Sequence, residues 1–390
     1  MEQDELDSDD WLQLVARLGG EAALAASARE HGAFLRARRL KSAVDLLRMA
    51  LMYGPGGQSL RSLAAMAAAQ GVADLSDVSL MERLRNAAGW LEALCAENLS
   101  RVARTIGVKD GNRPIRIVDG SRIEGPGNRA WRLHLCYAPH LARITDAAIT
   151  TLKEGERLDR LAVTPGEIRL GDRGYPHPDA IKDTLEAGAD VLLRLTWNSL
   201  QLRHADGQPL DWMRLFEQAN AQGALDLAVR VHKAHSREKP CEMRLVLIKK
   251  PPDAAARART KARRTRSKFQ RQRTDPRTLA AADHLILLTS LGAQDFPVDA
   301  IGALYRLRLQ IEIAIKRLKS ILRIDRLPAK DPDLARAWLY AHLLLALILD
   351  ETLADPGAIP PSTGNLSPDV PLAHDNSARK RPARRDLAAA

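Results

Sequence analysis

Two aspartates in this sequence occupy positions where a carboxylate can serve as a metal ligand. Asp119 closes the β-branched run Ile115–Val118 and Asp172 closes the run Glu167–Gly171, so each sits at the C-terminal end of a predicted strand. A strand end is rigid enough to aim a carboxylate into a cleft. There Mg²⁺ takes one or two carboxylates and keeps water and substrate phosphate as its other ligands. A lone aspartate after a strand is also a common turn residue, so the hypothesis needs a third acid.

The third acid stands on a predicted helix from Val298 to about Ile324. Four polar residues there are separated by three, four and seven positions, which at about 100° per residue puts them on one helix face: Tyr305, Arg308, Glu312 and Lys319. A parallel apolar stripe is expected to pack the helix on a sheet and consists of Leu304, Leu307, Ile311, Ile315 and Leu318. The spacing also fits a plain amphipathic helix on which Arg308 and Glu312 form an i,i+4 ion pair.

The same helix carries a signature that resembles a known family. Tyr305-x2-Arg308-x3-Glu312-x6-Lys319 is similar to the Y-(2)-R-(3)-E-(6)-K signature of bacterial insertion-sequence transposases of the insertion-sequence-four type. Four further blocks look like that family in the same order: Val118-Asp119-Gly120, Trp131-Arg132-Leu133-His134, Gly155-Glu156 before Leu170-Gly171-Asp172-Arg173-Gly174-Tyr175, and Leu288-Thr289-Ser290-Leu291. The resemblance runs from about Leu46 to Leu353.

The resemblance implies a DDE transposase with Asp119, Asp172 and Glu312 as its catalytic triad. The triad would hold two Mg²⁺ ions, for which Mn²⁺ can substitute, and would cut DNA at transposon ends before strand transfer into target DNA. Four side chains would hold the phosphates and ends of the transposon DNA: Tyr305, Arg308, Lys316 and Lys319. The implied partners are terminal inverted repeats, target DNA and a second protomer in a homodimer, because two ends must be paired.

Two departures from the family pattern leave alternatives open. Leu309 and Ile315 stand where relatives often carry bulky aromatic side chains, and the smaller side chains are expected to weaken the packing of the helix. A Pro- and Arg-rich sequence begins near Asp355, where the family usually continues with ordered sequence. One alternative is therefore a DNA-binding protein with a decayed, inactive transposase core. Another is an RNase H-like nuclease without joining activity.

The wider sequence predicts an α/β protein with an RNase H-like mixed sheet core. The core elements are expected as strands at 115–119, 131–137 and 143–151, a short helix at 155–161, a strand at 167–172, a helix at 178–187 and a strand at 189–195. Five segments follow from this order: an N-terminal all-α domain (1–105), the first part of the core (113–196), an inserted β-rich and basic segment (197–282), the second part of the core with C-terminal helices (283–354), and a disordered basic tail (355–390).

The N-terminal domain is a candidate for DNA binding. One helix is expected to be capped by Ser59, and another to start at Asp77 or Ser79 and to carry Leu80, Leu84, Ala87 and Leu91 on one face. Two short helices joined by a Gly-containing turn resemble a helix-turn-helix, although most such pairs are packing hairpins.

Positive charge is concentrated in two places. The formal net charge is +11, and between Arg257 and Arg277 ten basic residues stand against one acid, Asp275. This run, which includes Arg263, Arg264 and Arg266, predicts a phosphate track along DNA rather than only a solvated face. The second cluster lies in the tail, between Arg379 and Arg385.

Several classes of protein are disfavoured by the rest of the composition. Three widely spaced cysteines suggest neither a disulfide framework nor a zinc cluster, and the acidic N-terminus is unlike a signal peptide. The longest apolar run, Ala337–Leu349, is too short to span a bilayer and is expected to be a buried helix. We therefore expect a bacterial cytoplasmic protein that is associated with the nucleoid.

Overall fold

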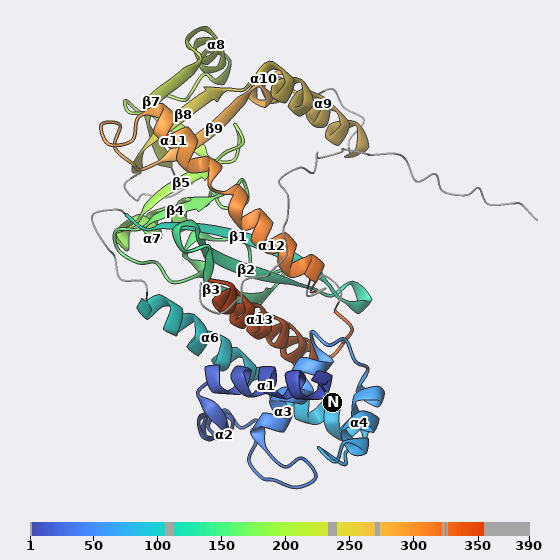
Figure 1. Cartoon of the computed structure of the whole chain (residues 1–390). Coiled ribbons are helices and arrows are strands. Elements are labelled where there is room, and N and C mark those ends of the chain that lie inside the picture. Colours follow the sequence, from blue (N-terminus) through green and yellow to red (C-terminus); the bar gives the residue numbers. More distant parts are fainter. Residues whose placement is uncertain are drawn as a thin grey trace, which may run out of the picture.

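A nine-stranded mixed sheet runs through the middle of the protein in the computed structural model (Figure 1). Its strand order is β3-β2-β1-β4-β5-β9-β8-β7-β6. The structure describes residues 2–105, 113–232, 240–269, 274–321, 324 and 327–354. The tail expected at 355–390 lies outside the described residues.

The first five strands confirm the predicted RNase H-like order. They are β1 (Ile115–Glu124), β2 (Ala130–Ala138), β3 (Arg143–Thr151), β4 (Ile168–Gly171) and β5 (Asp190–Arg194). The first three form an antiparallel meander, while β4 and β5 run parallel to β1. The connection between the parallel strands β4 and β5 contains α7 (Pro178–Glu186), which lies close to the predicted helix. Parallel strands need a long connection of this kind, usually through a helix.

Two expectations for this half are wrong. β1 does not end at Asp119, because its ladder with β2 continues to Glu124, so Asp119 lies within the strand. The helix expected at 155–161 is only a 3-10 turn, η3 (Leu158–Arg160). The carbonyl groups of Leu158 and Leu161 accept hydrogen bonds from the buried Arg169 guanidinium instead of closing helical turns.

The segment from 197 to 282 adds strands to the same sheet. β6 (Gln201–His204), β7 (Ala224–His232), β8 (Cys241–Lys249) and the core strand β9 (His284–Thr289) are all antiparallel to their neighbours. β9 pairs with both β5 and β8, and so joins the two halves into one continuous sheet. The helices of this half are α8 (Trp212–Gln222), α9 (Pro252–Phe269) and α10 (Pro276–Ala282).

Alternate residues along each strand enter two separate cores. Ile117 and Leu170 belong to the core shared with the N-terminal and C-terminal helices, whereas Val118 and Leu193 belong to the core that α7 and α8 cover. Successive side chains of a strand point to opposite faces. Asp119 therefore shares the face of Ile117, which is the face covered by the C-terminal helices.

The N-terminal segment is helical, as predicted. Its helices are α1 (Glu2–Arg17), α2 (Gly20–Glu30), α3 (Ala43–Tyr53), α4 (Leu60–Ala69), α5 (Asp77–Asn86) and α6 (Ala88–Thr105). Ser59 caps α4 as expected, and α5 begins at Asp77 with Ser76 as its cap. The expected face is divided between two helices, because α5 ends at Asn86 and Leu91 lies on α6.

The long apolar helix α13 (Pro332–Ala354) connects this helical region to the sheet. It packs against α3, α5 and α6 on one side and β3 on the other, as Figure 1 shows. Among the described residues, α13 alone is long and apolar enough to cross a membrane by length and composition. The helix is therefore longer than the apolar run Ala337–Leu349 on which the sequence expectation was based. However, 72% of its apolar window is buried inside the protein, which makes it a core helix.

The helix expected from Val298 to Ile324 is two helices. α11 (Val298–Arg306) and α12 (Leu309–Ile321) are separated by a turn at Leu307 and Arg308. In that turn the amide of Leu307 donates to Leu304 and that of Arg308 to Tyr305, so the backbone switches to i to i−3 hydrogen bonds. Neither proline nor glycine marks the break, which is why apolar periodicity alone does not detect it.

Candidate active site

Register places the two aspartates side by side. Ile117 of β1 pairs with Leu170 of β4. Asp119 stands two residues after Ile117 within β1, and Asp172 stands two residues after Leu170, directly past the end of β4. Because the side-chain period of a strand is two, both carboxylates project on the same face as the buried pair before them. Leu170 in turn pairs with Leu192 of β5, and two residues further stands Arg194. A row of two acids and one base therefore crosses three adjacent strands.

Each aspartate is held by a nearby glycine amide. The Asp119 Oδ1 atom accepts a hydrogen bond from the amide of Gly120 at 2.9 Å, and Asp172 Oδ1 accepts one from Gly174 at 2.7 Å. Burial raises the pKa of Asp119 to about 6; Arg308 opposes this shift and Asp172 adds to it. The Asp119 carboxylate is thus poorly solvated and lacks enough positive charge nearby, a state that a bound cation would relieve.

Glu312 reaches the same neighbourhood through Arg308. Glu312 lies in the first turn of α12, which packs against β1, and half of its side chain is exposed. The Arg308 guanidinium hydrogen-bonds to Glu312 and lies 3.5 Å from an Asp172 carboxylate oxygen. The i,i+4 ion pair considered from the spacing is therefore present. The same arginine also connects the third acid to the pair on the sheet.

The apolar stripe anchors α12 as predicted. Ile311 is fully buried and Ile315 packs against the same core, whereas the side chain of Leu318 lies outside the described residues. Burying one such side chain contributes roughly 1.5–3 kcal/mol. Leu309, by contrast, is 59% exposed and does not pack on the core.

The other DNA-contact candidates fall into three groups. Tyr305 is buried beside the acids; burial raises its pKa to about 12, and its hydroxyl has no hydrogen-bond partner among the described residues. Lys319 donates to the carbonyl of Arg122 on β1 at 3.3 Å, and Lys316 is exposed on α12. Three arginines lie elsewhere.

Those three arginines belong to α9, which lies beyond β8 and β9 and away from β1 (Figure 1). Arg263 and Arg264 are exposed on this helix. Arg266 is within the helix, but its side chain lies outside the described residues. The basic run is thus helical from Arg257 to Phe269, and it is not brought to the acids.

Sequence reasoning missed two cations that lie close to Arg173, the residue after Asp172. Arg194 ends β5 in the row described above, and its Nε is buried without a hydrogen-bond partner in the described structure. Lys250 follows β8, and its pKa is lowered to about 8 by burial and then by Arg194 and Arg173. Arg194 could have been found from the sequence only if the register of β5 against β4 had been known.

These residues suit a divalent metal ion and a phosphate. Among the described residues, no three histidine, cysteine or acidic side chains converge as a ready-made metal site. Asp119 and Asp172 nevertheless supply adjacent hard oxygen donors on a rigid sheet, which fits Mg²⁺ coordination. Glu312 would complete the set once it parts from Arg308. The surrounding cations suit the oxygens of a phosphodiester.

Comparison with known proteins points in one direction. Residues 110–349 match the family model described as the transposase DDE domain. The chain is 38% identical over 358 residues to the transposase InsL of insertion sequence element IS186A from Escherichia coli strain K12, covering 90% of this chain and 96% of that protein. It is similarly 38% identical over 359 residues to the transposase of insertion sequence element IS421 from Escherichia coli, with the same coverage.

Proposed function

Since the chain belongs to the DDE transposase family, whose members act on DNA with divalent metal ions, we propose that Asp119, Asp172 and Glu312 are its catalytic triad. The observation that carries the proposal is the shared register of the two aspartates, with Glu312 linked to them through Arg308. The triad proposed from the sequence signature is thus supported by side chains that gather in one place. The protein is a transposase, and the family match favours neither an inactive binder nor a simple nuclease.

We propose Mg²⁺ as the natural metal, in a two-ion site that also accepts Mn²⁺. Asp119 and Asp172 would hold the ions from the sheet, and Glu312 would hold them from α12. When bound, such ions activate a water or 3′-hydroxyl and stabilise the leaving oxygen of a phosphodiester. The raised pKa of Asp119 supports this assignment, because the buried carboxylate gains most from a neighbouring cation.

The chain's own cations would orient the phosphate. Arg308 has a largely buried side chain, 13% exposed, so its charge is poorly screened by solvent. On DNA binding, its guanidinium would exchange Glu312 for a phosphate oxygen and neutralise charge that develops during in-line transfer. The hydroxyl of Tyr305, which has no hydrogen-bond partner within the described part of the chain, would supply one more donor to the same phosphate. Lys316 and Lys319 would add further contacts to DNA phosphates along α12.

DNA is the partner of this chain, and we propose terminal inverted repeats and target DNA as its forms. The exposed α9 arginines would track phosphates without reading bases. We propose the N-terminal helical domain (1–105) as a second DNA-binding unit. It precedes in the chain the two parts of the core, 113–196 and 283–354, and the insertion between them, 197–282. We further propose a homodimer on paired ends, acting in the bacterial cytoplasm at the nucleoid.

The triad is tested by Glu312→Gln, which keeps the shape of the side chain and removes its charge. Cleavage of end DNA with Mg²⁺ should fall by about three orders of magnitude or more, while end binding survives, because only the metal ligand is lost. The matched control is Glu186→Gln, since Glu186 forms an i,i+4 pair with Lys182 on α7 away from the acids. Near-normal nicking by the Glu312 variant would rule out the triad.

A further inference from the structure

A fourth carboxylate, Glu156, is wedged between the segments that carry the two aspartates. It lies in the loop after β3, and its side chain is 25% exposed. An ideal Cβ built on Gly120 would come within 2.7 Å of Glu156 Oε1 and 2.9 Å of its Cγ. A Cβ on Gly174 would clash with the Glu156 Oε2 atom. The carboxylate of Glu156 therefore occupies space that exists only because both neighbours are glycine.

The two glycines have no backbone reason to be glycine. Neither has a positive φ, so an alanine would meet no conformational strain there. Gly120 lies inside β1, opposite His134 of β2, where a glycine weakens a strand unless another group must approach closely. The close approach here is that of Glu156. Both glycines are also the ones whose amides hold the Asp119 and Asp172 carboxylates.

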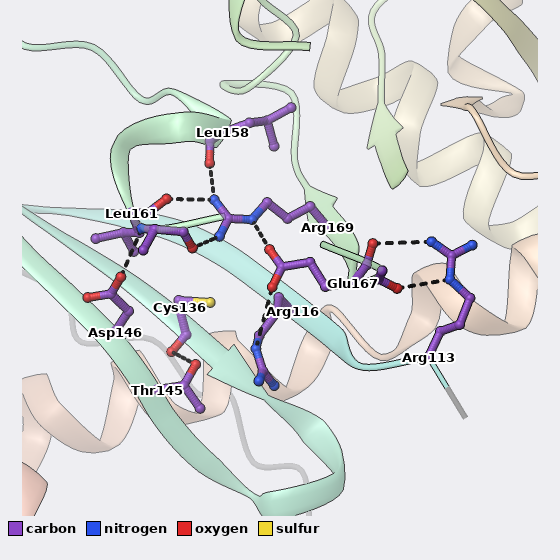
Figure 2. Close-up of polar contacts among 11 residues, drawn as sticks. Arg113, Arg116, Cys136, Thr145, Asp146, Leu158, Leu161, Glu167 and Arg169 are labelled. Atoms are coloured by element: carbon purple, nitrogen blue, oxygen red, sulfur yellow. Dashed lines mark hydrogen bonds and ion pairs between the residues drawn. The ribbon is translucent and has the colours of Figure 1, made fainter. Parts of the chain in front are cut away.

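The loop that presents Glu156 is fixed from two sides. Arg132 of β2 lies 3.6 Å from the Glu156 carboxylate and donates to the carbonyl of Glu154. Arg169 of β4, whose side chain is fully buried, donates to three loop carbonyls, those of Leu158, Leu161 and Ala162. Figure 2 shows this guanidinium between the loop and Glu167, which accepts from its Nε at 2.6 Å. The loop is thus attached to β4, the strand directly before Asp172.

We propose that Glu156 is a positioning residue that, by filling the space over Gly120 and Gly174, sets the separation and orientation of the Asp119 and Asp172 carboxylates. The inference rests on the proposed triad and adds a supporting residue beneath it. Supporting residues of this kind typically change metal affinity 10- to 100-fold. The proposal assigns the effect to the shape of the side chain rather than to its charge.

The experiment measures Mn²⁺ affinity by electron paramagnetic resonance on the full-length protein bound to pre-cleaved end DNA, with single-turnover cleavage in parallel. Glu156→Ala should weaken Mn²⁺ binding about 10- to 100-fold. Glu156→Gln should stay within about threefold of the wild type, because its amide fills the same space. Gly120→Ala should behave like Glu156→Ala, since the three atoms nearest to its new methyl group all belong to the flexible Glu156 side chain, which it displaces.

The double variant with both alanines provides the sharpest outcome. If Gly120→Ala acts by displacing Glu156, the double variant should be no weaker than Glu156→Ala alone, because the two changes remove the same contact. Gly155→Ala is the matched control, as a Cβ there meets nothing within 4 Å, and it should bind Mn²⁺ like the wild type.

Three results would overturn the proposal: wild-type affinity for Glu156→Ala, equal losses for the Ala and Gln variants, or additive losses in the double variant. Failure of the triad itself would be seen separately. In that case Asp119→Asn and Glu312→Gln would keep wild-type Mn²⁺ affinity, whatever the Glu156 series shows.

Discussion

A guanidinium nitrogen of Arg308 lies 3.5 Å from a carboxylate oxygen of Asp172. The same guanidinium also bonds to Glu312, so in the absence of metal one arginine neutralises two of the three proposed ligands. Arg308 and the metal ion therefore compete for the same carboxylates, although both are needed to bind the phosphate of the DNA.

Arg308→Ala should separate these two roles. In the DNA-free protein the variant should bind Mn²⁺ more tightly, by about three- to tenfold, because a nearby positive charge has gone. End cleavage should nevertheless fall, because the phosphate loses a cation. Metal titration and single-turnover cleavage measure the two effects, with Arg306→Ala, an exposed arginine on α11, as control. Weaker metal binding by the Arg308 variant would contradict the competition.

The raised pKa of Asp119 predicts a pH-dependent stability. Its folded value of about 6 exceeds its ordinary value of 3.8, so the folded state takes up the proton first as the pH falls. Metal-free protein should therefore gain stability from this group between about pH 6 and pH 4. Asp119→Asn should raise the thermal midpoint by roughly 2–4 °C at pH 7.5 in chelator, and by much less at pH 4.5. Asp295→Asn, at an exposed loop position, should show no such difference.

The α9 arginines should bind DNA through phosphates alone. Neutralising Arg263 and Arg264 together should weaken binding to every duplex sequence alike and reduce the slope of log affinity against log salt by about 0.9 per lost contact. The control removes the same charge from exposed arginines elsewhere, Arg203 of β6 and Arg214 of α8. An equal change of slope in the control would mean that total charge, and not this helix, carries the effect.

The buried guanidinium of Arg169 should be costly to remove. Arg169→Leu leaves the buried Glu167 carboxylate without its closest partner and strips three loop carbonyls of their donor. The expected loss is about 3–5 kcal/mol in the free energy of unfolding. Arg157→Leu in the same loop, where the ion pair with Asp159 is about one-third exposed, should lose less than about 1 kcal/mol. Denaturant unfolding compares the two, and similar losses would show that burial is not decisive.

The elements that hold the aspartates could be predicted because their signals are local. A β-branched run marks β1, a short apolar run with Ile168 and Leu170 marks β4, and an acid after each run marks a candidate ligand. The break before α12 was missed because apolar spacing continues unchanged through Leu307, while only the backbone hydrogen bonds shift. The wedge at Glu156 depends on contacts between residues distant in the chain, and no spacing rule encodes them. Its one local trace was a glycine within two residues after each aspartate, Gly120 and Gly174, inside family blocks whose physical reason the sequence did not reveal.

The neighbouring positions of β5 and β9 have a consequence for how far the segment between them can change. The chain leaves the core after Arg194 and re-enters beside the same strand, antiparallel to it, so a tight hairpin of a few residues can in principle close the gap. The segment between these strands can therefore vary in length without changing the pairing of β5 with β9. Such a change, even one that removes the basic helix α9, leaves untouched the pairing of β1 with β4 that places Asp119 and Asp172 side by side.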